Sequence, residues 1–144
     1  MTSLGEELLD QIDEARERLY ASVRARAPET LAQRPTPEAW SVVENVRHLL
    51  FAEQKHLGRL YVEGFAYSPI GLRTDGRQRA SGAGSQPTDD IEEVLAVWDA
   101  VHEEVREALR GAADPSAELD RNLRHLRSHV RTIEKLLDER DGER

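Results

Sequence analysis

The chain has 144 residues, about the length of one globular domain, and 38% of them are hydrophobic, 5% aromatic and 33% charged. This composition favours a soluble, all-α protein, because a β-sheet protein needs more β-branched and aromatic residues. The 20 basic and 28 acidic side chains give a net charge of -8, which repels the phosphates of nucleic acids and anionic lipids. We therefore expect one domain over residues 1–144, with neither nucleic acid nor a membrane as a partner.

Two features that the sequence lacks restrict the possible location and chemistry of the protein. No run approaches the roughly 18 apolar residues of a membrane span. The first residues, MTSLGEELLDQID, are acidic where a secretory signal is basic and then apolar, so a cytoplasmic location is expected. The sequence also has no cysteine, which excludes disulfides, thiolate metal ligands and a catalytic thiol of the protein itself. Any sulfur chemistry would need an external thiol.

The first predicted helix covers about residues 3–27. Its apolar residues recur at spacings of three and four, which is typical of the buried side of an amphipathic helix. These residues are Leu8, Ile12, Ala15, Leu19 and Val23. Ser3 and Glu6 have the spacing of a capping box at the start of the helix. Three prolines between residues 28 and 37 then predict a short connection.

A second helix is predicted over about residues 41–61, opened by a capping box of Ser41 and Glu44. We assign Glu44 to this cap and to no chemistry. The apolar side of the helix consists of Val42, Val46, Leu49, Leu50, Leu57 and Leu60. Phe51 falls outside this side, which makes it a candidate contact in a homodimer.

A long loop is expected over residues 62–87, between the second and third helices. This segment has five glycines, two prolines and no sustained periodicity, so burial offsets little of its backbone entropy. We expect the loop to be mobile and to cover the mouth of a substrate site.

The third helix is predicted to begin with Asp89 and Glu92 and to end near Gly111. Its apolar residues are Ile91, Leu95, Trp98, Val101, Val105 and Leu109. The fourth helix begins near Ser116, just after Pro115, and its apolar residues alternate at spacings of four and three, as bundle packing requires. They are Leu119, Leu123, Leu126, Val130, Ile133 and Leu137. Together these helices predict an up-down four-helix bundle.

Two histidines lie one turn apart on the predicted fourth helix, where His125 and His129 can point nitrogens at one ion. They flank the apolar side of that helix, so we expect them at a helix interface. An alternative is that both are partly exposed polar residues beside the core, with no ligand. A metal site needs a third ligand, and periodicity alone leaves His48, His56 and His102 open.

His56 and His102 lie on the core sides of their helices, and each could be a ligand or a buried, hydrogen-bonded histidine. The structural role is favoured for both. Glu53 lies in the middle of an apolar side, where an unpaired charge is costly. Two interpretations of Glu53 are open: it accepts a hydrogen bond from the second nitrogen of a ligand histidine, or it pairs with an arginine.

The runs WSVVENVRHLL, which begins at Trp40, and HLRSHVRTIEKLL, which begins at His125, resemble the DinB-like superfamily. That superfamily consists of small four-helix bundles in which one histidine follows a Trp-Ser helix start and two more form HxxxH near the C-terminus. The resemblance implies that His48, His125 and His129 bind a divalent metal. It also implies a relation to S-transferases and an isomerase that use low-molecular-weight bacterial thiols.

Three neutral imidazoles leave a coordination position open for water or a thiol, which is typical of catalytic rather than structural zinc. Zinc is the expected ion and nickel the next candidate. We therefore hypothesise a metal-dependent S-transferase that joins an external thiol to a small-molecule substrate, or a hydrolase. Two alternatives stay open: a metal-binding or ligand-binding bundle without turnover, and a scaffold whose histidines are structural. The sequence indicates no particular catalytic side chain.

Overall fold

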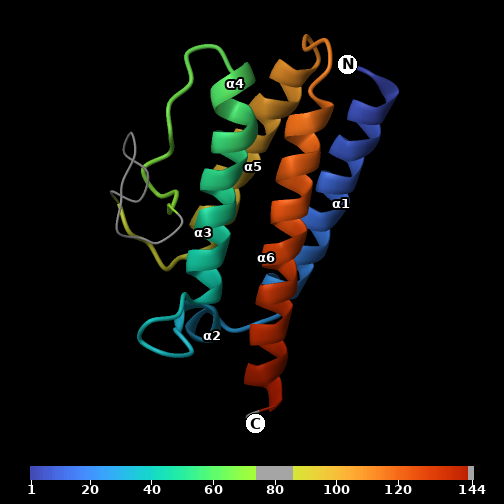
Figure 1. Cartoon of the computed structure of the whole chain (residues 1–144). Helices are drawn as coiled ribbons and strands as arrows, with labels where there is room; N and C mark the ends of the chain where they lie inside the picture. Colours follow the sequence, from blue (N-terminus) through green and yellow to red (C-terminus); the bar gives the residue numbers. More distant parts are fainter. Residues whose placement is uncertain (74–85, 143–144) are drawn as a thin grey trace.

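Four long helical segments form the fold (Figure 1). The structure, a computed structural model, describes residues 1–73 and 86–142, and within these residues there are helices and no strands. The segments are α1 (Ser3–Arg24), α3 (Val42–Glu53) continued by the π-helical turn η1 (Gln54–Gly58) and by α4 (Arg59–Tyr61), α5 (Ile91–Leu109) and α6 (Ser116–Gly142). The short helix α2 (Pro28–Ala32) lies in the connection after α1. The predicted all-α class is confirmed.

The capping box predicted at Ser41 is confirmed. The Ser41 hydroxyl accepts a hydrogen bond from the backbone N–H of Glu44 at 3.1 Å, and the Glu44 carboxylate accepts one from the backbone N–H of Ser41 at 3.0 Å. The box predicted at Ser3 is wrong, because Thr2 is the cap and its side chain accepts from the N–H of Gly5 at 3.1 Å. Thr2 has an extended backbone whereas Ser3 is already helical, so only the Thr2 oxygen faces the free amides.

Two helix ends differ slightly from their predicted positions. The cap of α5 is Asp90 rather than Asp89, and its carboxylate accepts from two N–H groups of the first turn. The helix α1 ends at Arg24, before its predicted end, because Ala27 precedes Pro28 and adopts an extended backbone. A proline disfavours the helical conformation in the residue before it. The helix α6 begins where it was predicted.

The direction of α5 differs from the predicted up-down alternation. In the view of Figure 1, α1 runs down, α3 and α5 run up, and α6 runs down. Ion pairs confirm that α1 and α5 are antiparallel, since Arg24 contacts Glu92 and Asp13 contacts His102. Residues 62–73 run back along α3 after α4 ends, and Leu72 there donates to Arg47 of α3, so α5 can begin at the same end of the molecule as α3. The arrangement is compatible with a four-helix bundle.

One hydrophobic core joins the four segments, and the predicted apolar sides supply most of it. The largest fully buried side chains are Trp98, Ile12, Leu19, Leu31, Leu50, Leu57, Leu95, Leu109, Leu119, Leu123, Ile133 and Leu137. Leu60 was expected in the core but is 49% exposed. The wider turn η1 interrupts the 3.6-residue period just before it. No helix in the described parts of the chain is both long and apolar enough to cross a membrane.

The first part of the long connection, residues 62–73, packs against α3. Ile70 and Leu72 are buried, and the N–H of Leu72 donates to the carbonyl of Arg47 at 3.1 Å. This differs from the expectation of a loop with little burial. The loop was expected to be mobile over residues 62–87, and residues 74–85 of it lie outside the described part of the chain.

Phe51 is buried by this connection. Its side chain is 3% exposed and stacks on Tyr67 with ring centroids 5.3 Å apart. Gly71 passes so close that a Cβ added there would lie 3.3 Å from the Cβ of Phe51. The interpretation of Phe51 as an exposed homodimer contact is therefore wrong, because a segment of the same chain already covers it.

Candidate metal centre

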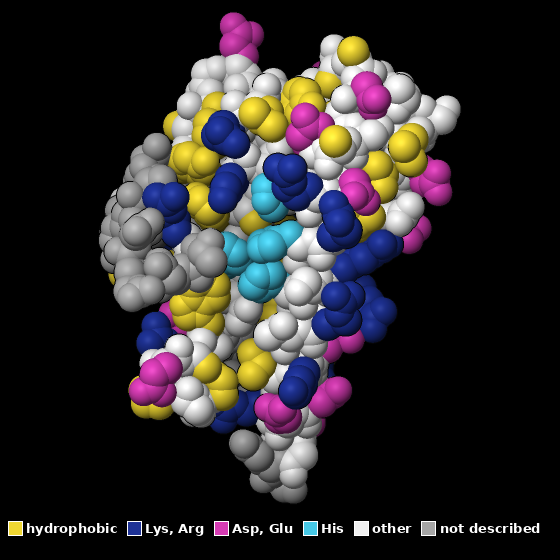
Figure 2. All heavy atoms as spheres, viewed as in Figure 1, with side chains coloured by type: hydrophobic (Ala, Val, Ile, Leu, Met, Phe, Trp, Pro, Cys, Tyr) yellow, Lys and Arg dark blue, Asp and Glu magenta, His cyan; other side chains and the backbone are white. Residues whose placement is uncertain are grey.

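Three histidines from two helices meet between α3 and α6 (Figure 2). His48 comes from α3, and His125 and His129 come from consecutive turns of α6. One ring nitrogen of each lies within 4.8 Å of the others, and Nε2 of His48 is 3.2 Å from Nε2 of His125. His48 is 4% exposed, and the other two rings are half-buried. The structure thus brings together the three predicted site residues.

Simple backbone rules place these rings. The four-residue spacing puts His125 and His129 on one side of α6, and their ring centroids are 4.5 Å apart. The Ser41 cap fixes where α3 begins, and two turns later this helix carries His48 to the level of the pair. The centroid of His48 lies 5.0 Å from that of His125 and 4.9 Å from that of His129.

Hydrogen bonds determine which nitrogen of two rings carries the proton. Nδ1 of His48 donates to the backbone carbonyl of Leu72 at 2.8 Å, so its Nε2 keeps a free lone pair. Nδ1 of His129 donates to the side-chain carbonyl of Asn45 at 3.1 Å, with the same consequence. The amide nitrogen of Asn45 donates to the carbonyl of Ser41 at 2.9 Å, which fixes the orientation of that amide. Both Nε2 atoms are therefore in the form that binds a metal ion.

The electrostatic surroundings keep the three rings neutral. Burial, together with the neighbouring rings of His129 and His48, lowers the pKa of His125 to about 3. Burial and the nearby His48 lower the pKa of His129 to about 4. The pKa of His48 is also lowered, first by burial, although its bond to the carbonyl of Leu72 opposes the shift. The lowered pKa values favour the neutral imidazole, which is the form of histidine that binds a metal ion.

The donor set fits a transition-metal ion such as zinc. Zinc–nitrogen bonds of about 2.0–2.1 Å in tetrahedral geometry put two ligand nitrogens about 3.3 Å apart. The 3.2 Å separation of the His48 and His125 nitrogens is close to this value, and the ligand nitrogens of all three rings lie within 4.8 Å of one another. Nδ1 of His125 is buried and has no hydrogen-bond partner among the described residues. Three ligands would leave one tetrahedral position open.

A pocket of about 340 Å³ opens beside the three histidines. It is lined by Trp40, His48, Phe51, Ala52, Lys55, His56, His125 and His129. Larger hollows of about 450 Å³ and 690 Å³ lie between α1 and α6 and beside residues 62–66. No histidine is among the described residues that line either hollow. Within the described residues, the group that could hold a metal ion lies at the smaller pocket.

His56 lies at the edge of the site. Its Nδ1 is hydrogen-bonded to the side-chain carbonyl of Asn122 at 3.1 Å, and its ring centroid is 5.5 Å from that of His125. Burial lowers its pKa, and the charges of Lys55, Arg121 and Arg59 add to that effect against the bond to the asparagine. His56 is thus a hydrogen-bonded neighbour of the three-histidine group.

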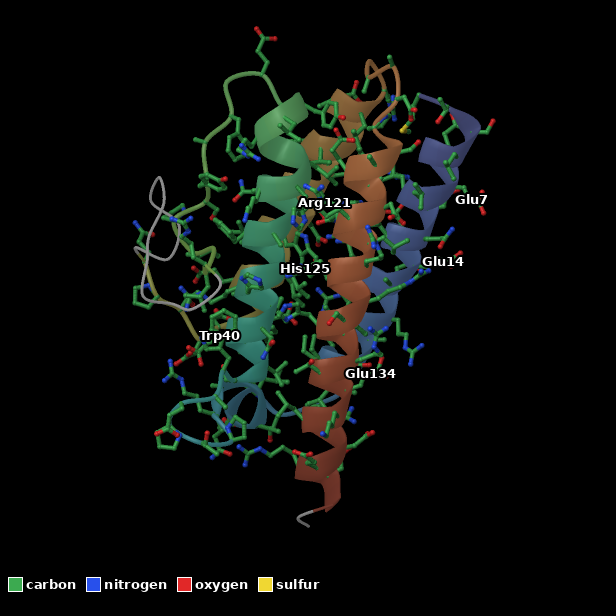
Figure 3. All side chains as sticks on the ribbon, in the orientation of Figure 1. Glu7, Glu14, Trp40, Arg121, His125 and Glu134 are labelled. Atoms are coloured by element: carbon green, nitrogen blue, oxygen red, sulfur yellow. The ribbon has the colours of Figure 1, made fainter. Side chains whose placement is uncertain are left out.

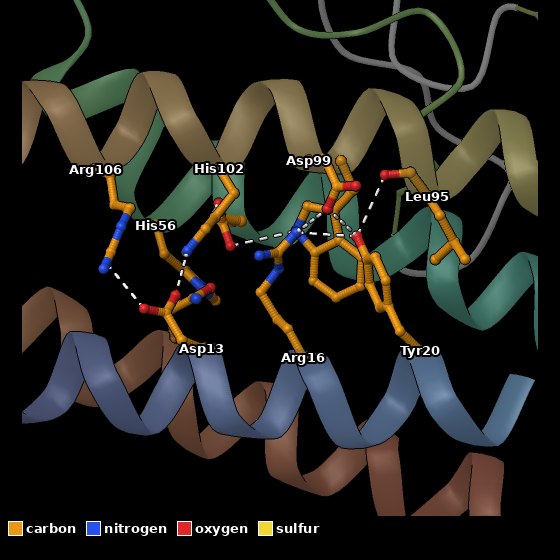
Figure 4. Close-up of polar contacts among 11 residues, drawn as sticks. Asp13, Arg16, Tyr20, His56, Leu95, Asp99, His102 and Arg106 are labelled. Carbon is orange, nitrogen blue, oxygen red and sulfur yellow. Dashed lines mark hydrogen bonds and ion pairs between the residues drawn. The ribbon is translucent and has the colours of Figure 1, made fainter. Parts of the chain in front are cut away.

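His102 is a buried, hydrogen-bonded histidine, which is the role favoured from the sequence. Its Nε2 lies 2.6 Å from the Asp13 carboxylate and its Nδ1 lies 2.9 Å from the Glu53 carboxylate (Figure 4). Burial alone lowers its pKa, but the two carboxylates raise it to about 9. The ring is therefore protonated at neutral pH and donates both hydrogen bonds. A protonated imidazole has no lone pair for a metal ion.

Glu53 has neither of the roles considered from the sequence. Its carboxylate is 1% exposed and accepts from Nε1 of Trp98 at 3.3 Å as well as from His102. Its charge is compensated by the protonated imidazole, so neither a ligand histidine nor an arginine is its partner in these contacts. Glu53 and His102 belong to the contact between α3, α5 and α1, on the other side of α3 from the candidate metal centre.

Sequence reasoning missed the groups that orient and surround the histidines. Asn45 has a detectable signal, since it lies three residues before His48 and so near the same side of α3. The carbonyl of Leu72 has no such signal, because its position depends on an irregular segment. Trp40 and Lys55 line the pocket only because the cap and η1 place them there.

The fold and this site together define a class: an all-helical protein with a three-histidine group that could hold a metal ion. The family model of the DinB superfamily matches residues 11–138, so the chain belongs to the DinB superfamily. This confirms the resemblance indicated by the motifs around His48 and His125. Searches of curated proteins and of solved structures gave no match.

Proposed function

We propose that this protein is a metal-dependent enzyme on a four-helix bundle, in which His48, His125 and His129 hold one divalent ion. The observation that carries the proposal is the direction of two hydrogen bonds. Nδ1 of His48 and Nδ1 of His129 both donate to protein acceptors, so their Nε2 atoms are unprotonated. One ring nitrogen of each of the three histidines lies within 4.8 Å of the others. A set of neutral imidazoles that share one point is the donor set of a metal ion.

Zinc is the ion that we favour, and nickel is the second candidate. Imidazole nitrogens suit both ions, and three histidines with an open position are a common set for catalytic zinc. Such an ion lowers the pKa of a thiol or a water molecule in its open position. The chain's own residues supply the rest: the Leu72 carbonyl and Asn45 hold two rings in place, and Trp40 and Ala52 give the pocket an apolar wall.

Transfer of an external thiol to a small-molecule substrate is favoured over hydrolysis. None of the described residues that line the pocket is Asp or Glu, whereas metal-dependent hydrolases commonly use a carboxylate as the general base. A thiol needs no such base, because coordination itself removes its proton. The chain has no cysteine, so the thiol in this proposal is a separate molecule.

A metal-binding or ligand-binding bundle without turnover, with or without self-association, is the second candidate. The same absence of a carboxylate from the described pocket lining favours it. Besides the candidate ligands, only His56 and Lys55 in that lining could transfer a proton.

A thiol-conjugation assay distinguishes these candidates. The zinc-loaded protein is incubated with a panel of low-molecular-weight thiols and an electrophile such as 1-chloro-2,4-dinitrobenzene, and product formation is followed by absorbance. We expect turnover that a chelator or His48→Ala removes and that Lys135→Ala, at an exposed position on α6, retains. Stoichiometric metal without turnover across the panel favours the second candidate. Full turnover in His48→Ala contradicts the proposed site.

A further inference from the structure

Basic side chains surround the mouth of the histidine pocket (Figure 2). Lys55 lines the pocket, and Arg59 lies one turn further along, with its Nε donating to the carbonyl of Lys55 at 3.2 Å. Arg121 comes from the opposite helix, one turn before His125, and Figure 3 shows both on the side of α6 toward α3. We call Lys55, Arg59 and Arg121 the basic rim.

The basic rim has no carboxylate partner among the residues that the structure describes. Other arginines do pair with carboxylates: Arg16, Arg18, Arg24, Arg26, Arg34, Arg106, Arg110 and Arg124. The described lining of the pocket also contains no acidic residue. In a chain with a net charge of -8, this mouth is a local region of uncompensated positive charge.

The histidines that line the pocket add no negative charge to it. Because the candidate ligands are neutral, none of them offsets a cation. A concave site of one charge sign concentrates the field and attracts ligands of the opposite sign.

One wall of the same pocket is apolar. The ring of Trp40 lies 5.3 Å from that of His48, and the ring of Phe51 lies 6.2 Å from it. Ala52 of α3 lines the pocket as well. A ligand that enters therefore contacts hydrophobic surface on one side and the basic rim on the other. The volume of about 340 Å³ suits a small molecule.

We infer that the substrate of this pocket is a small organic anion. Its negatively charged group pairs with Lys55 and Arg121, and its apolar body lies against Trp40. This inference rests on the proposed function, because it names the substrate class of the same pocket.

Benzoate is a suitable probe, since it combines a carboxylate with a flat apolar body. It is titrated by calorimetry into zinc-loaded and metal-free protein, and the fluorescence of Trp40 reports that the pocket is occupied. The buried Trp98 contributes a background that a Trp40→Phe variant measures. Benzamide serves as the neutral analogue and phenyl phosphate as the phosphate analogue. The metal content of every sample is measured in parallel.

The double variant Lys55→Met with Arg121→Met removes two charges of the basic rim. Arg124→Met is the matched control, because Arg124 lies on the same helix but pairs with Asp120 at 3.0 Å. We expect the double variant to weaken benzoate binding by about five- to tenfold, as the loss of two exposed ion pairs implies. The Arg124→Met control should bind benzoate as tightly as the unchanged protein does. Added salt should weaken benzoate binding to the control and to the unchanged protein.

Tighter binding of phenyl phosphate than of benzoate identifies the anionic group as a phosphate, and the reverse order identifies it as a carboxylate. Undiminished benzoate binding in the double variant overturns the inference, and so does equal affinity for benzamide. If metal-free protein binds benzoate and the metal-free double variant does not, the anion site is supported even where the metal analysis finds no ion. Failure of the inference is therefore distinguishable from failure of the proposed function.

Discussion

The side-chain carbonyl of Asn45 accepts a hydrogen bond from Nδ1 of His129 at 3.1 Å, which joins α3 to α6 at the candidate metal centre. The amide nitrogen of Asn45 donates to the carbonyl of Ser41, the residue that caps α3. The first turn of α3 thus determines which nitrogen of His129 faces the other two rings. Positioning of this kind tunes the affinity of a ligand histidine for its ion.

Replacement of Asn45 by alanine should therefore weaken metal binding. We expect Asn45→Ala to lower zinc affinity by about tenfold, at the lower end of the effects of such outer hydrogen bonds. Competition with a chromophoric chelator measures the affinity. Asn122→Ala is a matched control, because Asn122 is also bonded to a histidine Nδ1, that of His56, outside the three-histidine group. An equal loss of affinity in both variants would show that the bond from His129 has no special role.

The stability of the protein should decrease at alkaline pH because of His102. Its pKa is about 9 in the folded chain against 6.5 ordinarily, so the folded state holds the proton more tightly. This stabilisation is complete below about pH 6.5 and is lost as the pH rises through about 9. We expect the free energy of unfolding to fall by on the order of 2 kcal/mol between about pH 7 and pH 10, as measured by urea denaturation.

The variant His102→Gln is the control for this pH dependence, because it removes the titrating ring from Asp13 and Glu53. Its unfolding free energy should be lower at neutral pH and should change less between the two pH values. No cysteine titrates in this range to obscure the result. An equally steep decline in the variant would assign the effect to other groups.

Removal of the ion should lower the melting temperature through the three histidines. Zinc at a hundred times its dissociation constant stabilises a folded protein by about 2.7 kcal/mol. For a chain of this size the shift is on the order of 5–10 °C in a thermal melt. The chelator should have this effect on the unchanged protein and almost none on His125→Ala. If His125→Ala lowers the melting temperature equally with and without chelator, packing explains this residue and ligation does not.

Apolar periodicity predicted the long helices well, because the core needs only one consistent side of each. The parallel direction of α3 and α5 was not predictable, since a connection as long as residues 62–90 can return the chain to either end of the molecule. Phe51 was misread for a related reason. The contacts that cover it come from Tyr67 and Gly71, which lie in a segment without periodicity.

The candidate site was predicted through resemblance to a family and not through helix geometry alone. The spacing of His125 and His129 indicates a pair of ligands, but nothing in the periodicity of α3 selects His48. The partner of Glu53 was also beyond prediction from helix periodicity. This partner, His102, lies on another helix, and a single sequence does not say which helices are neighbours.

The central claim is that His48, His125 and His129 hold one ion. Untagged protein is purified, reconstituted with zinc, desalted and analysed by elemental mass spectrometry against the variant His48→Ala. The account predicts close to one zinc per chain in the unchanged protein and almost none in the variant. No stoichiometric ion in the unchanged protein, with nickel and cobalt tried in place of zinc, would contradict it.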